Sequence, residues 1–265
     1  MIYFSFLLQT DPKYKPAERL FTALAANGVQ YKLLDGTRDI WLRDFMPVKT
    51  RSGKYISFRY EPGYLKDNPE LRTDFRAEIA PSLSLKNLIY SDINLDGGNI
   101  VFSPARETAV ISDRIFEENP KLSSAELVRE LEKLLEARVI IIPSLRSDMT
   151  GHADGMVRFV SENTAVGNAS KSLFGLEAHI KTVLRNHGIE VYNFPYFDSK
   201  GGSAIGCYLN FLETENAIFL PVFGIDMDKK AVDAANHIFN KTLVPININE
   251  ISEDGGVLNC ISWEN

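Results

Sequence analysis

The stretch Thr150-Gly151-His152-Ala153-Asp154-Gly155-Met156-Val157-Arg158-Phe159-Val160 is one of five glycine- or acid-bearing segments that each follow a strand, a helix and a strand. Because it runs into alternating apolar residues, we expect His152 and Asp154 on one face of a strand, with both side chains in one pocket. Two interpretations are open. His152 could be a buried histidine that is hydrogen-bonded to a neighbouring carboxylate, or the two residues could be a functional pair that is buried despite the cost of desolvation.

The same order of elements recurs with a period of about 50 residues, which is typical of repeat architectures. Proline near the first helical turn, glycine after the last one, and a capping box at Ser123 and Glu126 delimit the helices. The expected helices cover 16–27, 69–79, a stretch from 123, 173–187 and 228–239. The expected strands cover 2–8, 31–34, 55–58, 87–90, 100–103, 108–112, 138–143, 164–167, 189–194, 207–212, 217–221 and 242–245. No low-complexity linker interrupts the pattern, so we expect one α/β domain over residues 1–265.

Composition and charge favour a small cationic substrate over a polyanion. The chain has 265 residues, 45% of them apolar and 24% charged, with a net charge of −6 spread throughout. A nucleic-acid or anionic-membrane partner is therefore disfavoured, and residues 2–8 are too short to span a bilayer. Two cysteines are too few for a disulfide framework or a zinc ligand set, so we expect a cytoplasmic protein without a bound metal. The sequence is compatible with a homo-oligomer.

Polar residues fall at comparable places in successive repeats. Asp39 and Asp44 come first, then Asp96, then His152 with Asp154, and finally Cys260. If the repeats surround a common axis, these segments converge at its centre. Ionised cysteine is a nucleophile, histidine transfers protons near neutral pH, and carboxylates bind cations. Several acids near one thiolate repel it unless a cation is bound, which predicts activation by the substrate.

Some of these residues also have structural interpretations. In residues 39–47, an extended chain would place Ile40, Leu42 and Asp44 on one face. Trp41 could be a core residue or a support for this segment. Cys207 competes with Cys260 on composition alone, and a buried, inert thiol is a possible state for either. We expect Cys207 to lie away from the pocket.

Four ordered motifs carry a family resemblance. They are Asp39-x-Trp41-x-Arg43-Asp44-x-x-Pro47, Asp96-Gly97-Gly98-Asn99, Gly151-His152-x-Asp154-Gly155 with Arg158-Phe159, and Gly255-Gly256-x-x-x-Cys260. Together they resemble the agmatine deiminase and Porphyromonas-type peptidylarginine deiminase family of the guanidino-group modifying (pentein) superfamily. The segments Tyr208-Leu209-Asn210-Phe211 and Leu220-Pro221-Val222-Phe223-Gly224 extend the similarity.

The resemblance implies a fold, a reaction and a set of roles. The fold is a five-bladed α/β propeller of ββαβ units. Cys260 would attack a guanidinium carbon, and His152, oriented by Asp96, would protonate the departing amine and then activate water. Asp44 and Asp154 would hold the guanidinium, with Trp41 and Asp39 also expected in the substrate-binding set. Hydrolysis of the covalent thiouronium would give a ureido product and ammonia without a cofactor.

The chain departs from the family pattern at Asn259, where a histidine is usual before the cysteine, and at Asp96, where glutamate is common. Agmatine deimination is the leading hypothesis. Deimination of arginine or peptidylarginine, amidinotransfer to an amine, and a catalytically silent binding propeller are the alternatives. A Cys-His peptidase is a further alternative, although its mechanism has no need of so many carboxylates.

Overall fold

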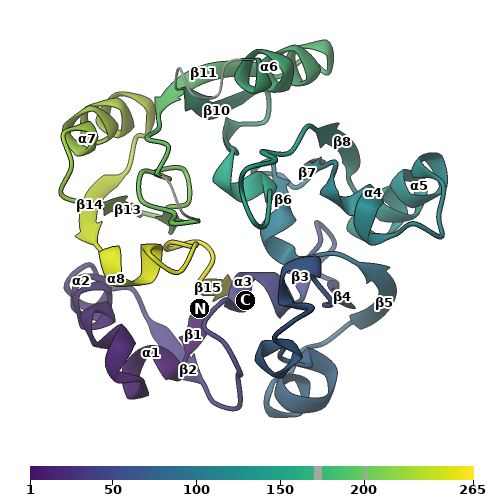
Figure 1. Cartoon of the computed structure of the whole chain (residues 1–265), viewed down its shortest axis with the longest axis horizontal. Helices are drawn as coiled ribbons and strands as arrows, with labels where there is room; N and C mark the ends of the chain where they lie inside the picture. Colours follow the sequence, from purple (N-terminus) through teal and green to yellow (C-terminus); the bar gives the residue numbers. More distant parts are fainter. Residues whose placement is uncertain (170–174, 200–201) are drawn as a thin grey trace.

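Five three-stranded sheets surround a common axis in the computed structural model, which describes residues 1–169, 175–199 and 202–265 (Figure 1). In each sheet the central strand pairs antiparallel with one neighbour and parallel with the other. The sheets are β15-β1-β2 (Ser262–Glu264, Ile2–Ser5, Tyr31–Leu34), β3-β4-β5 (Val48–Lys49, Tyr55–Arg59, Leu88–Asn94), β6-β7-β8 (Ile100–Phe102, Thr108–Ser112, Arg138–Ile142), β9-β10-β11 (Val157–Ser161, Thr164–Ala169, Glu190–Pro195) and β12-β13-β14 (Leu212–Glu213, Ala217–Val222, Thr242–Asn247).

A parallel pair requires a crossover, and here the crossover is helical and lies on the outside of the ring (Figure 1). Four sheets use α2 (Glu18–Ala26), α4 and α5 (Arg114–Glu118, Ser124–Leu135), α6 (Leu176–Asn186) and α7 (Met227–Ile238). The expected capping box is present, since Ser123 and Glu126 bond to each other's backbone nitrogens. The ββαβ propeller predicted from the sequence is confirmed.

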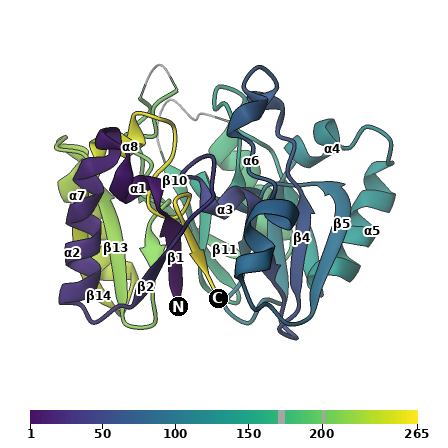
Figure 2. The same cartoon turned by 90° about the horizontal axis from the view of Figure 1, so that it is seen from below.

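The two ends of the chain complete one sheet. β15 pairs antiparallel with β1, with Ile2 opposite Glu264, so the first sheet contains both the first and the last strand (Figure 2). This pairing closes the ring between the first and fifth sheets and removes two free edges. Within the described part of the chain, no helix is long and apolar enough to cross a membrane.

The second crossover differs from the expectation of a continuous helix over 69–79. The chain instead forms short turns, namely η2 (Gly63–Leu65), η3 (Pro69–Leu71), the π-helical η4 (Phe75–Ile79) and η5 (Ala80–Ser82). Asp74 breaks the run by capping η4, where its carboxylate accepts a hydrogen bond from the Ala77 nitrogen. The backbone is extended at Arg72 and Asp74, so the segment is not one helix. The helix propensity summed over residues 69–79 did not show these interruptions.

Four other expectations for strands were wrong, each where a side chain bonds to the backbone or the chain turns. β1 ends at Ser5, whose hydroxyl accepts from the Leu7 nitrogen and leads into α1 (Leu7–Thr10), followed by η1 (Pro12–Ala17). Residues 42–45 form the helical turn α3 (Leu42–Phe45). Asp154 lies in the turn η7 (Ala153–Gly155), before β9, and His152 directly precedes this turn. Residues 207–211 are turns, so β12 contains only Leu212–Glu213. The expected helix at 173–187 is seen as α6 from Leu176, and residues 173–174 lie outside the described residues.

Candidate active site

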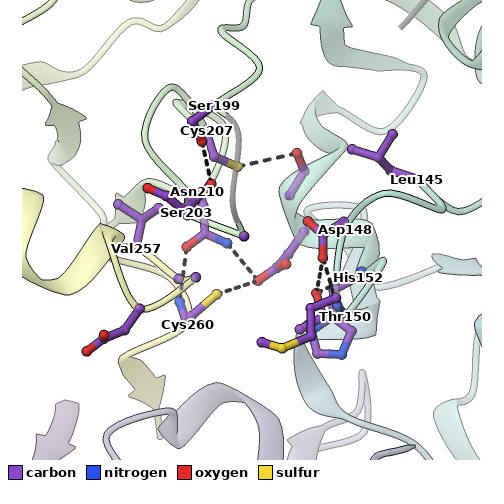
Figure 3. A pocket seen from close by; sticks show the side chains of 18 of the residues that line it. Leu145, Asp148, Thr150, His152, Ser199, Ser203, Cys207, Asn210, Val257 and Cys260 are labelled. Carbon is purple, nitrogen blue, oxygen red and sulfur yellow. Dashed lines mark hydrogen bonds between the residues drawn. The ribbon is translucent and has the colours of Figure 1, made fainter. Parts of the chain in front are cut away.

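The connections between successive sheets meet at the axis of the ring. They are α3, the turn η6 (Gly97–Asn99), η7, residues 202–211, and residues 253–261, which follow α8 (Asn249–Ser252). All of them except η6 contribute residues to the wall of a cavity of ≈ 320 Å³. Its wall includes Asp44, His152, Asp154, Asn210 and Cys260, although these side chains are far apart in the sequence. Figure 3 shows His152, Asn210 and Cys260 in this wall.

Glycines allow these connections to approach so closely. A Cβ at Gly97 would lie 2.1 Å from the Arg43 carbonyl oxygen, and one at Gly98 would lie 2.5 Å from Oδ1 of Asp44. Asn99 links β7 to η7, because its Oδ1 accepts hydrogen bonds from the backbone nitrogens of Ser112 and Ala153. The segment Asp96–Asn99 is therefore a packing unit that sets the distance between α3 and η7.

His152 is buried between two carboxylates. Its Nε2 lies 2.9 Å from Oδ2 of Asp96, and its Nδ1 lies 3.6 Å from Oδ1 of Asp44. Burial opposes a charge on the ring, but Asp44, Asp96 and Asp154 outweigh that effect and raise the pKa of His152 to about 10. The imidazole is consequently protonated near neutral pH and can donate a proton into the cavity.

Asp44 is buried where its charge is disfavoured. Its Oδ1 accepts from the Gly98 nitrogen at 3.2 Å and its Oδ2 from the Tyr64 hydroxyl at 3.3 Å. Burial, reinforced by the charges of Asp96 and Asp154, raises the pKa of Asp44 to about 7, although His152 and Tyr64 oppose the shift. A cation placed beside this carboxylate would favour its ionised form.

The thiol of Cys260 faces a carboxylate. Its Sγ lies 3.7 Å from Oδ2 of Asp154, and its backbone nitrogen donates to Oδ1 of Asn210 at 3.2 Å. Burial, with the negative charges of Asp154 and Asp44, raises the pKa of the Cys260 thiol well above its ordinary value. The thiol is therefore held in its neutral form while nothing positive lies between it and the two acids.

Two asparagines that we did not predict as site residues hold Asp154 in place. Oδ2 of Asp154 accepts from Nδ2 of Asn210 at 3.0 Å and from Nδ2 of Asn259 at 2.7 Å. Arg158 in turn donates to Oδ1 of Asn259 at 3.0 Å. The period of the repeat could have revealed Asn210, because the fourth connection contributed no residue to the predicted site and Asn210 occupies it. Tyr64 had no comparable signal.

The structure brings most of the seven predicted site residues together. Asp44, His152, Asp154 and Cys260 line the cavity, and Asp96 lies behind His152. Trp41 lines it too, and its ring packs so closely on Gly256 that a Cβ there would lie 2.3 Å away. Asp39 is not among the described residues of the wall, because its carboxylate turns back to accept from the Ile40 nitrogen. Its substrate-binding role stays a prediction.

The expectation for Cys207 was wrong. Cys207 lies in the wall of the same cavity, with its Sγ 3.5 Å from the Gly155 carbonyl oxygen (Figure 3). The fourth connection folds over the axis because the Ala204 nitrogen bonds to the Ser252 carbonyl at 2.7 Å. Burial, with the charges of Asp154 and Asp148, raises the pKa of the Cys207 thiol above its ordinary range. Two thiols therefore face the cavity, and the Cys260 thiol is the one bonded to Asp154.

No group of three or more histidine, cysteine, aspartate or glutamate side chains is arranged to hold a metal ion in the described ranges. The chemical resources of the cavity are thus one protonated imidazole, two thiols, several carboxylates and amides. This set can hold a planar cation against a nucleophile and deliver a proton to it.

Comparison with solved structures defines the class. A C. jejuni agmatine deiminase superposes with a TM-score of 0.76 at 16% identity, covering 99% of this chain and 92% of that one. An Enterococcus faecalis agmatine deiminase has a TM-score of 0.68 at 18% identity, covering 84% of this chain and 73% of that one. DDAH from Pseudomonas aeruginosa has a TM-score of 0.63 at 11% identity, covering 94% of this chain and 87% of that one. This is the pentein fold of guanidino-group modifying enzymes.

The sequence itself places the chain within that class. Residues 7–265 match the Porphyromonas-type peptidyl-arginine deiminase family. The protein belongs to this family, whose members are hydrolases of C–N bonds. A search of curated protein sequences finds no match.

Proposed function

We propose that the protein is a cysteine-dependent deiminase of a small guanidine that carries a second positive charge, with agmatine as the leading substrate. The observation that carries this proposal is the charge of the cavity. Five aspartates line it, namely Asp44, Asp148, Asp154, Asp198 and Asp254, and no lysine or arginine is among the described lining residues. The His152 imidazolium is already held between Asp44 and Asp96, so the aspartates would repel a substrate with an α-carboxylate and attract an amine.

Family membership supports the reaction type, and the relative in C. jejuni that shares the fold is an agmatine deiminase. In the proposed reaction the Cys260 thiolate attacks the guanidinium carbon and a C–S bond forms. One C–N bond then breaks as His152 protonates the leaving nitrogen, which departs as ammonia. Water deprotonated by His152 attacks the thiouronium, the C–S bond breaks, and a ureido product leaves with the thiolate regenerated.

The electrostatics of the cavity explain how a thiol with a raised pKa could serve as the nucleophile. The two acids that disfavour the Cys260 thiolate, Asp154 and Asp44, line the cavity and are also the residues that we expect to bind the guanidinium. Once their charge is neutralised by the substrate, the penalty on the thiolate falls. The substrate would thus ionise its own nucleophile, as expected from the sequence.

The test is an assay of ammonia and ureido product with agmatine, free arginine and an arginine-containing peptide. We expect kcat/KM for agmatine to exceed that for arginine by at least about 100-fold, since an unpaired buried carboxylate is costly. Cys260→Ala should abolish turnover. Absence of turnover with every guanidine, or full turnover in Cys260→Ala, would refute the proposal. A preference for arginine or the peptide would support cysteine-dependent deimination but would contradict agmatine as the substrate.

A further inference from the structure

A second cavity, of ≈ 680 Å³, lies at the other end of the axis. It is lined by both chain ends, which Figure 2 places opposite α8, and by Arg43, Arg106 and Arg158. Asp154 borders both cavities, and Asn259 belongs to the wall of the second. The two spaces therefore meet at the Asp154–Asn259 hydrogen bond, but their linings differ in charge.

Three arginines contribute to the wall of this second cavity. Arg158 donates to Asn259 and stacks on Phe211, with 4.4 Å between its Cζ and the ring centroid. Arg106 donates to the Lys49 carbonyl at 2.8 Å and lies 4.9 Å from the Phe102 ring centroid. Nε of Arg43 lies 3.3 Å from the Asn259 carbonyl oxygen. Each group keeps further N–H donors for which the described residues provide no hydrogen bond.

Their charges are incompletely compensated. Arg43, Arg106 and the nearby Lys49 form no ion pair within 4.0 Å among the described residues. Burial lowers the pKa of Arg106 and of Arg158, and the charge of Arg43 adds to the effect on both, while Glu264 opposes it. All three arginines line the same cavity.

The acids around this cavity do not cancel the cluster. Glu213 is already paired with Lys241 at 2.8 Å and with Arg158 at 3.7 Å. Glu215 and Glu264 are exposed at the rim, whereas the four cations are partly buried. Asp154 is bonded to two amides on the side of the first cavity. A small anion could approach the guanidinium groups without displacing an existing ion pair.

Arg106 also holds an unusual backbone conformation. Its φ is +58°, in the turn between β6 and β7, where glycine or asparagine would be less strained. This conformation accompanies a guanidinium that lines the cavity and does not extend into solvent. The strain is compatible with a functional side chain at this position.

We propose that Arg43, Arg106 and Arg158, with Lys49, form a binding site for a small oxyanion of the phosphate or carboxylate type. Planar guanidinium groups bind two oxygens of such an anion at once, and several of them around one space repel each other until it is occupied. The site is separate from the acid-lined cavity and does not depend on deiminase activity.

Isothermal titration calorimetry with inorganic phosphate and with succinate, each at constant ionic strength in sodium chloride, tests the site. We expect saturable binding of at least one anion in the millimolar range or tighter, and at least about tenfold weaker binding in Arg106→Gln. Phosphate alone, or succinate alone, would identify the oxyanion type. The acid-lined cavity should contribute nothing, because its five aspartates repel both probes.

Arg129→Gln, which changes an exposed arginine on α5, is the matched control and should bind as the wild type does. Lys49→Gln provides a second variant if Arg106→Gln fails to fold, and it should weaken binding at least threefold. No binding of either anion would overturn the proposal. Unchanged anion binding in whichever of Arg106→Gln and Lys49→Gln folds would also overturn it. An equal loss of anion affinity in Arg129→Gln would do the same. None of these outcomes depends on whether guanidines are turned over.

Discussion

The hydrogen-bond partner of the Cys260 thiol is the carboxylate of Asp154, 3.7 Å away, and not the imidazole of His152. This arrangement differs from a thiolate–imidazolium pair, in which a histidine lowers the pKa of the thiol. Here burial and the neighbouring carboxylate both raise the pKa of the Cys260 thiol. In the proposed function, the thiol would therefore become reactive only when a positive charge lies between the two groups.

The first prediction concerns thiol reactivity. Asp154→Asn removes the charge closest to the sulfur, so the Cys260 thiolate should form at lower pH. We expect alkylation of Cys260 by iodoacetamide at pH 8 to accelerate at least about tenfold, although kcat/KM falls by at least 100-fold. Peptide mass spectrometry distinguishes Cys260 from Cys207. Asp198→Asn, at an exposed position of the cavity wall, should leave the alkylation rate unchanged; slower alkylation in Asp154→Asn would contradict this account.

A second prediction is the pH profile. Activity should rise as pH passes about 7, where Asp44 ionises, and fall near pH 10, where His152 loses its proton. The Tyr64 hydroxyl lowers the pKa of Asp44, so Tyr64→Phe should move the acidic limb to higher pH. Tyr192→Phe is the control, since that side chain is 61% exposed. An acidic limb that stays in place in Tyr64→Phe would exclude Asp44 as its origin.

A third prediction links function to stability. The pKa of Asp44 is about 7 in the folded protein and its ordinary value is 3.8, so folding takes up a proton between these values. Stability should therefore decrease as pH rises from about 4 to about 7, and the cost persists above pH 7. Asp44→Asn lacks this titration. We expect its free energy of unfolding to exceed that of the wild type at pH 8, with turnover lost; urea titrations at pH 5 and pH 8 measure the difference.

The fourth prediction concerns Gly98. A Cβ there would lie 2.5 Å from Asp44 Oδ1 and 2.7 Å from His152 Nδ1, so Gly98→Ala should displace both side chains and lower kcat by at least 100-fold. Gly63→Ala is a matched control, because nothing lies within 4 Å of its added carbon. Comparable kcat values in the two variants would show that the spacing of Asp44 and His152 is not critical.

Asn259 allows a fifth prediction. It donates to Asp154 and accepts from Arg158, so Asn259→Ala removes one hydrogen-bond partner from each of these two charged groups. We expect a loss of about 2 kcal/mol in stability and a higher KM, because Asp154 is no longer held toward the substrate. Thermal unfolding and steady-state kinetics report the two effects. Asn216→Ala, at an exposed position before β13, should change neither.

Much of the fold was predictable because it is encoded locally. Apolar periodicity, prolines, glycines and a capping box recur about every 50 residues, and the resulting elements agree with the observed sheets. The errors fall in irregular segments. Residues 42–45 and 152–155 form turns and residues 207–211 lack strand pairing, since their conformation depends on contacts with other connections.

The sequence by itself determined the repeat and the candidates Asp44, Asp96, His152, Asp154 and Cys260, because each follows a regular element at a comparable position. The ring of five blades was predicted from the family resemblance. Only the tertiary structure decided what these residues contact. Asp154 is bonded to Asn210, 56 residues away, and to Asn259, 105 residues away. It also excluded Asp39 from the cavity wall and brought Cys207 into it. Side chains from separate repeats meet only when the ring closes, and periodicity within one segment carries no information about those contacts.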